Sequence, residues 1–179
     1  MRTIVAVIIL LASVDAVLSA PRHIFNQSSG LWPIGFSYYC MDNPAECEPL
    51  PPGVSTAPLE YREWKGLLDS VNAQTNASIV YVPERIDHWT LAPKRGDCDD
   101  YALTKRDELI KRGVPKGALH MAFALMAWGE PHVVLLVDTT EGQKVLDNLT
   151  DEVYDLEQMM AQRLSIQDAT HPRKWTQIF

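Results

Sequence analysis

The spacing of apolar residues predicts two helices in the middle of the chain. In the first, apolar side chains fall at positions i, i+3, i+4 and i+7, the pattern of an amphipathic helix. These positions are Trp64, Leu67, Leu68 and Val71. The pattern starts near residue 59 and fades near residue 76.

The second helix is bounded by clear start and stop signals. Asp97 can cap its N-terminus, and Gly113 followed by Pro115 ends it. Ala102 with Leu109, and Leu103 with Ile110, lie two turns apart and are expected to face the core. Cys98 therefore belongs to the first turn of this helix.

After residue 117 the period changes to that of strands. Apolar runs at 118–128, 132–138 and 144–148 are separated by turns at Gly129–Pro131 and Glu141–Gly142. The pattern predicts antiparallel hairpins, with a further short strand or extended segment at 78–83. Residues 151–161 have a helical pattern.

The N-terminus predicts a signal peptide over residues 1–20. Arg2 precedes an apolar run at 4–12, and small residues follow at Ser19 and Ala20. The run is shorter than the roughly 20 residues of a membrane span, and no second long run follows, so we expect an exported protein without a membrane span after cleavage. An uncleaved anchor is the alternative. Residues 21–58 are rich in proline, serine and aromatic residues and predict an irregular arm.

Composition excludes one class of partner. The formal net charge is -7, so the chain lacks the basic surface of a protein that binds nucleic acid. The approximately 160 residues that follow the predicted signal peptide are enough for one domain with a core of its own.

Two of the three cysteines are candidates for a disulfide, and the third is left unpaired. Cys40 and Cys47 are seven residues apart, and a turn at Asn43–Pro44 could bring them together as a disulfide in an oxidising compartment. Cys98 is then the odd thiol. It could be a nucleophile, part of a metal site, or a buried small apolar residue.

Electrostatics alone leave the role of Cys98 open. A helix N-terminus lowers a thiol pKa, but Asp97, Asp99 and Asp100 oppose that effect. A neighbouring histidine would restore reactivity as a general acid and base. Among five histidines, His132 is the best placed, because the next hairpin returns Asp147 or Asn148 to within a residue or two of it.

The segments "GDCDDYALTKRDELIKRGVP", "HVVLLVD" and "VLDNL", in this order, resemble the bacterial transglutaminase-like cysteine proteinases, the family of the LapG-like periplasmic proteases. "YYCMDNPAEC" is similar to the paired-cysteine arm of that family, and "DHWTLAPKRGDC" to the approach to its nucleophile. The resemblance covers most of the chain after the predicted signal peptide.

The resemblance implies an α+β fold with a papain-like, transglutaminase-like core, in which a nucleophile helix packs on an antiparallel sheet. It assigns Cys98 as nucleophile, His132 as general acid and base, and Asp147 as the residue that orients the imidazole. Residues 59–179 would form the protease domain. We therefore expect a periplasmic or secreted cysteine endopeptidase with a protein substrate, by analogy a surface adhesin.

Two rival functions keep the same fold. A transglutaminase or amidotransferase would resolve the thioester with an amine, and a binding module would use the cleft without catalysis.

The resemblance also implies calcium beside the nucleophile, with Asp97, Asp99 and Asp100 as ligands. LapG-like sequences usually have glutamate where this chain has Asp99, so one ligand is a methylene shorter; helix capping by Asp97 with two solvated acids is the alternative. Trp89, in the loop before Cys98, could line the cleft or the oxyanion site, or it could pack in the core.

Overall fold

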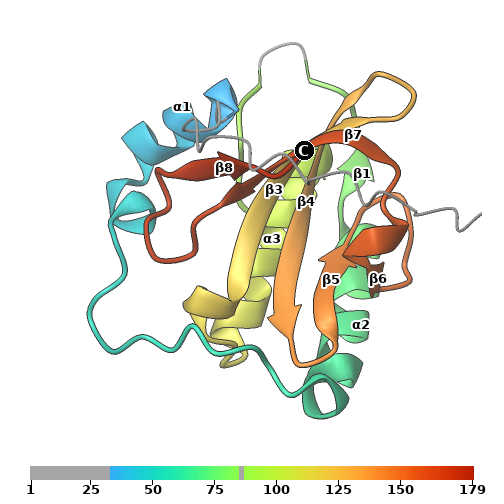
Figure 1. Ribbon diagram of the computed structural model, residues 1–179. Helices are drawn as coiled ribbons and strands as arrows, with labels where there is room; N and C mark the ends of the chain where they lie inside the picture. Colours follow the sequence, from blue (N-terminus) through green and yellow to red (C-terminus); the bar gives the residue numbers. More distant parts are fainter. Residues whose placement is uncertain (1–32, 85–86) are drawn as a thin grey trace, which may run out of the picture.

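The computed structural model describes residues 33–84 and 87–179. Within these residues, three α-helices pack on one large sheet (Figure 1). They are α1 (Ile34–Asp42), α2 (Tyr61–Ser78) and α3 (Cys98–Lys111). In the described part of the chain, no helix combines the length and apolar character that crossing a membrane requires. The predicted signal peptide lies outside the described residues.

As far as the chain is described, the large sheet has six strands in the order β6-β5-β4-β3-β7-β8, and all neighbours are antiparallel. The strands are β3 (Leu119–Met126), β4 (Pro131–Thr139), β5 (Gly142–Leu146), β6 (Tyr154–Asp155), β7 (Ala161–Gln167) and β8 (Trp175–Gln177). A separate pair, β1 (Val80–Tyr81) and β2 (Arg95–Gly96), is parallel. The predicted hairpins and the α+β class are confirmed.

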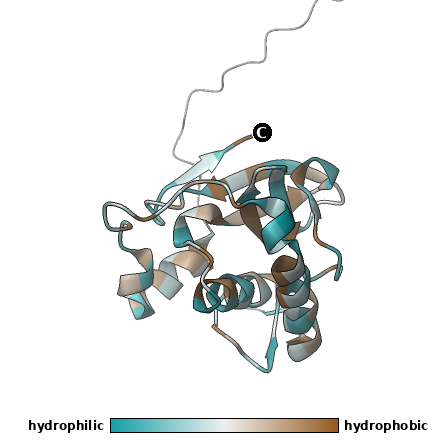
Figure 2. Ribbon diagram, turned by 90° about the horizontal axis from the view of Figure 1, so that it is seen from below, coloured by the Kyte–Doolittle hydropathy of each residue, from teal (hydrophilic) through white to brown (hydrophobic). Residues whose placement is uncertain are grey.

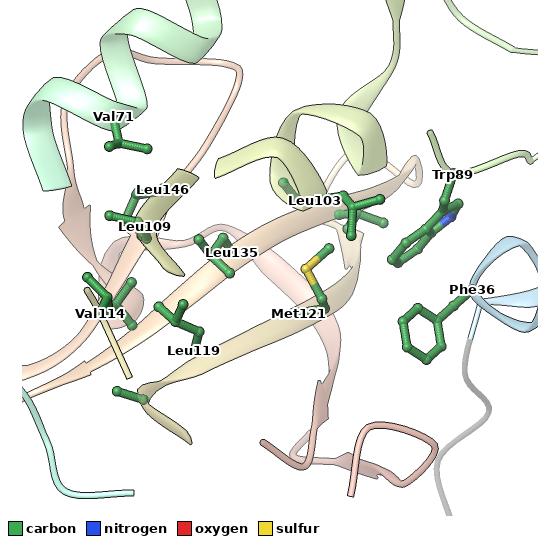
Figure 3. Packing of buried hydrophobic residues seen from close by; sticks show 14 of the residues in the cluster. Phe36, Val71, Trp89, Leu103, Leu109, Val114, Leu119, Met121, Leu135 and Leu146 are labelled. Carbon is green, nitrogen blue, oxygen red and sulfur yellow. The ribbon is translucent and has the colours of Figure 1, made fainter. Parts of the chain in front are cut away.

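Each face of the large sheet buries its own apolar cluster. On the helix side, alternate residues such as Met121 and Leu135 pack against Leu103 and Leu109 of α3. Figure 3 shows this core, with Phe36 and Trp89 together at one end and Val71 at the other. Figure 2 shows hydrophilic and hydrophobic residues alternating along the helices, as expected where only one side of a helix is buried. Residues of the other parity, such as Ala122 and Leu136, form the second cluster.

The described part of the predicted arm, residues 33–58, is more ordered than its composition predicts. Its described part contains α1 and a 3-10 helix at Pro44–Cys47, and the predicted Cys40–Cys47 disulfide joins them. Phe36 of α1 packs edge-on against Trp89 and Trp175, with ring centroids 5.3 and 5.5 Å away. The described part of the arm therefore belongs to the main core.

The helix predicted for residues 151–161 is wrong. This segment contains β6 and only a 3-10 turn at Leu156–Gln158 before β7 begins. Tyr154 and Asp155 pair with Val145 and Lys144 of β5, and the Lys144 ammonium binds the Asp155 carboxylate. These long-range contacts override the local helical pattern.

Replacing Phe36 with alanine should destabilise the whole domain, because the side chain fills the space between two buried tryptophans. We expect a loss of about 3–5 kcal/mol in the free energy of unfolding, measured by urea denaturation. Tyr38→Ala is the matched control on the same helix, since Tyr38 is 45% exposed. If Phe36→Ala lowers the free energy of unfolding as little as the exposed control, α1 does not belong to the core.

Candidate active site

The start of α3 is fixed by its own aspartates. Asp97 occupies the N-cap position, as predicted, and its N–H donates to Asp100 Oδ2 at 3.1 Å. Asp100 Oδ1 accepts the N–H of Thr90 at 2.6 Å, so this buried carboxylate ties the preceding loop to the helix. Only glycine fits at position 96, because an added Cβ would lie 2.0 Å from Asp100 Oδ2. These contacts set the backbone that carries Cys98.

Cys98 is a partly buried free thiol in the first turn of α3. Burial raises its pKa to about 12, and the nearby carboxylates of Asp99 and Asp97 add to this shift. Hydrogen bonds from the backbone amides of Val133 and Asp99 act in the opposite direction. The expected conflict between thiol and aspartates is therefore present. Cys98 needs a proton acceptor to become a nucleophile at neutral pH.

His132 and Asp147 are both buried, and they are hydrogen bonded to each other. His132 Nε2 lies 2.8 Å from Asp147 Oδ1. The strand register explains the contact, because Leu135 of β4 pairs with Leu146 of β5. Asp147 therefore lies opposite Val134, and His132, two residues before Val134, is the diagonal neighbour of Asp147. With Nε2 engaged, Nδ1 is the nitrogen left to exchange a proton with a thiol.

Asp147 is held by more than the histidine. The N–H of Leu149 donates to Oδ1 at 3.0 Å, and the hydroxyl of Tyr154 donates to Oδ2 at 2.8 Å. Burial alone would raise the pKa of Asp147, but the hydrogen bonds from His132, Leu149 and Tyr154 outweigh it and leave that pKa below its usual value. Asp147 is thus an ionised, immobile partner for the imidazole.

Cys98 and His132 line the same cavity, which has a volume of about 100 Å³. Its walls come from β1, the β3–β4 hairpin and the segment after β5. The remaining lining residues are Tyr81, Met126, Trp128, Glu130, Pro131, Asn148 and Leu149. Nucleophile, imidazole and a space for a reacting group therefore coincide.

The three predicted calcium ligands are placed differently from one another. Ligand atoms of Asp97, Cys98 and Asp99 lie within 4.8 Å of each other. Asp97 Oδ1 and Asp99 Oδ2 are buried, and neither has a hydrogen-bond partner in the described part of the chain. Burial raises the pKa of Asp99 well above its usual range, and the neighbouring Asp97 carboxylate adds to this shift, first by hydrogen bonding and then by its charge. Asp100, in contrast, uses both oxygens to accept backbone amides. The free carboxylate oxygens belong to Asp97 and Asp99.

Trp89 is not among the residues that line the cavity. Its buried ring packs against Phe36, and its indole N–H donates to Asp87 Oδ1 at 2.8 Å. The structure therefore places it in the core, the second of the two roles considered from the sequence.

Sequence reasoning missed Lys105, which lies on the nucleophile helix two turns after Cys98. Its side chain is 0% exposed, and Nζ has no hydrogen-bond partner among the described residues. Burial lowers its pKa to about 7, against the opposing charges of Asp147 and Asp151. Its place in the charged stretch "TKRDE" predicts exposure. The spacing is the signal that could have identified it, because Lys105 lies three residues after Ala102 and four before Leu109, on the side of the helix that faces the core. Tyr154 was missed as well, because the helix predicted for 151–161 hid its pairing with β5.

A cysteine at the head of a helix, with a histidine–aspartate pair on the adjoining sheet, is the arrangement of the transglutaminase-like cysteine hydrolases. Residues 26–179 match the family model described as bacterial transglutaminase-like cysteine proteinase. The chain belongs to this family of cysteine peptidases, as its motifs indicated. No curated protein sequence gives a significant match.

Solved structures of LapG from Legionella pneumophila share the fold. One aligns with a TM-score of 0.50 and 23% identity over 60% of this chain and 68% of LapG, and an EGTA-treated form gives 0.50 and 23% over 57% and 65%. A calcium-bound form gives 0.48 and 26% over 52% and 58%. This chain thus matches less than two thirds of two of these three LapG chains.

Lys105 gives stability a specific pH dependence. Because its folded pKa of about 7 lies below the ordinary 10.5, the unfolded chain binds more protons between these values, and this contribution to stability rises with pH. Relative to Lys105→Met, the native protein should gain up to about 1.4 kcal/mol per pH unit above pH 7, measured by urea denaturation. Lys111→Met changes a lysine on the exposed side of α3, so the native protein should show no such gain relative to this variant. The same dependence of stability on pH in the native protein and in Lys105→Met would contradict the prediction.

Proposed function

We propose that this protein is a cysteine endopeptidase whose triad is Cys98, His132 and Asp147. The observation that carries the proposal is the cavity that Cys98 shares with His132, whose other ring nitrogen is fixed by Asp147. Each side chain comes from a different element: α3, β4 and the segment after β5.

In the first half of the reaction, His132 Nδ1 accepts the thiol proton as Cys98 Sγ bonds to the peptide carbonyl carbon. Because the thiol pKa is high in the free protein, proton transfer accompanies attack. Backbone amides at the start of α3, including that of Cys98, stabilise the oxyanion. His132 then gives its proton to the leaving amine as the C–N bond breaks, and a thioester remains.

In the second half, His132 removes a proton from water, and the hydroxide attacks the thioester. The C–S bond breaks, and the thiolate regains its proton from the imidazolium. Asp147 stabilises the imidazolium in both halves, and its hydrogen bonds from Leu149 and Tyr154 keep it ionised and in place.

The substrate we propose is a protein met outside the cytoplasm, in the periplasm or after secretion. The Cys40–Cys47 disulfide supports an oxidising compartment, and the N-terminal sequence supports export. By analogy with LapG-like proteases, a surface adhesin is a candidate substrate.

The triad is tested by labelling and cleavage together. Near neutral pH, iodoacetamide should modify Cys98 selectively in the non-reduced protein, and His132→Ala should reduce labelling to the rate of an ordinary buried thiol. Cleavage of an unfolded protein such as casein should fall by about 10²–10⁴ in the same variant, as expected for loss of a general acid and base. Tyr154→Phe, which removes one support of Asp147, should have a smaller effect. Unchanged labelling and cleavage in His132→Ala would refute the triad.

Including a fluorescent amine in the same assay separates the two rival functions. Amine incorporation without cleavage would indicate a transglutaminase. Absence of both reactions, with normal folding, would indicate a binding module.

We further propose that Asp97 and Asp99 hold a calcium ion. Two buried carboxylate oxygens on neighbouring acids, both without a hydrogen-bond partner among the described residues, suit a hard divalent cation. When bound, calcium would neutralise the negative charge beside Cys98. Calcium takes six to eight oxygen ligands, so backbone carbonyls or water would complete the set.

Calcium should raise the unfolding temperature of the native protein, and EGTA should reverse the rise. Asp99→Asn should abolish the calcium effect, yet without calcium it should be at least as stable as the native protein, because the buried amide has no charged form for burial to penalise. Asp107→Asn, also on α3, should keep the calcium response. A calcium response that survives Asp99→Asn would place the ion elsewhere.

A further inference from the structure

The short strand β1 has an unused edge beside the nucleophile. Val80 donates its N–H to Lys94 O at 3.0 Å, and Val82 donates to Gly96 O at 2.8 Å. In a parallel pair, alternate residues direct both backbone groups to the same neighbour, so the N–H and C=O of Tyr81 point away from β2. Within the described residues, β1 and β2 form a sheet of only two strands. The Tyr81 edge is therefore open to a third strand.

This edge is close to the reacting groups. Tyr81 pairs with Gly96, which is two residues before Cys98 in the chain. The Tyr81 side chain lines the cavity together with Cys98 and His132. A chain lying along the edge would thus pass the thiol.

Apolar side chains surround the same opening. Tyr81, Trp128 and Leu149 line the cavity, yet they are 57%, 51% and 59% exposed. The Trp128 indole N–H donates to Glu130 Oε2 at 3.0 Å, which fixes the ring on the β3–β4 hairpin. Large exposed apolar groups around one cavity are typical of a binding surface.

We propose that the substrate binds as an extended strand added to β1, with its main chain hydrogen bonded to Tyr81 and its apolar side chains against Trp128 and Leu149. This recognition depends on the proposed peptidase function and narrows its substrate class. Main-chain pairing needs a segment without secondary structure of its own. The substrate site is then an unfolded linker or terminus with apolar residues near the scissile bond, and helices and folded domains are excluded.

N-methylation of the substrate tests the pairing directly. Peptides spanning a site cleaved in casein are made with each backbone nitrogen methylated in turn. The amide facing Tyr81 C=O should lose about tenfold in kcat/KM, as for one lost hydrogen bond, while the amides on either side of it should lose little. Uniform losses, or none, at all positions would overturn the proposal.

Two substitutions separate the Tyr81 backbone from its side chain. Tyr81→Ala removes the ring, whereas Tyr81→Pro removes the ring and the N–H. The kcat/KM of Tyr81→Pro should be about fivefold lower than that of Tyr81→Ala, after both values are corrected for any change in the rate of Cys98 alkylation. Equal values for the two variants would contradict pairing through the Tyr81 N–H.

Amide hydrogen exchange separates failure of this inference from failure of the peptidase function. Casein peptides are titrated into Cys98→Ala, and exchange at Tyr81 is followed. Slower exchange at Tyr81 would support strand addition whether or not the native protein cleaves the peptide. Slower exchange without cleavage would refute the peptidase function alone. Peptide binding without slower exchange at Tyr81 would refute strand addition alone.

Discussion

The packing of α3 against β4 is the constraint on which the site depends. Buried leucines of α3 meet the apolar side chains of β4 on the helix side of the sheet. This contact brings the first turn of α3 to the beginning of β4. There the backbone amide of Val133 donates a hydrogen bond to the Cys98 thiol, and His132 is the residue before Val133. A shift of one helical turn, about 5.4 Å, would separate the thiol from the imidazole while preserving most apolar burial. The capping contacts of Asp100 fix this position, because they tie the first turn of α3 to the preceding loop.

Asp147 links the sheet to the chemistry in a similar way. It accepts hydrogen bonds from β4, from its own following loop and from Tyr154 of β6. The β6 strand is only two residues long, and its pairing with β5 is what brings the Tyr154 hydroxyl to the carboxylate. A peripheral strand therefore has a direct part in holding the imidazole partner.

The local sequence pattern predicted the secondary structure correctly where local preferences and tertiary contacts agree. Helix caps, strand alternation and hairpin turns predicted α2, α3 and the β3–β5 meander, and with them the approach of His132 to Asp147. It failed where long-range contacts decide. The helix α1 exposes Ile34, Tyr38 and Met41 on one side and buries Phe36 and Tyr39 on the other, so its apolar residues show no single face. Burial of Lys105 depends on tertiary packing, which a charged sequence conceals. The order of the six strands also could not be read from adjacent segments.

Among the described residues, three of the buried polar atoms without a hydrogen-bond partner lie at the start of the nucleophile helix or further along it. Asp97 Oδ1 and Asp99 Oδ2 lie beside the nucleophile, and Lys105 Nζ lies two turns further along the same helix. Such groups cost stability, and proteins retain few of them. Replacing buried polar groups by apolar groups of the same shape can be neutral or stabilising, so packing alone gives no reason for these acids and this lysine on one buried helix. The neighbouring thiol gives such a reason for the acids. A cation bound by the two free oxygens would also neutralise the carboxylate charge that adds to the high pKa of Cys98.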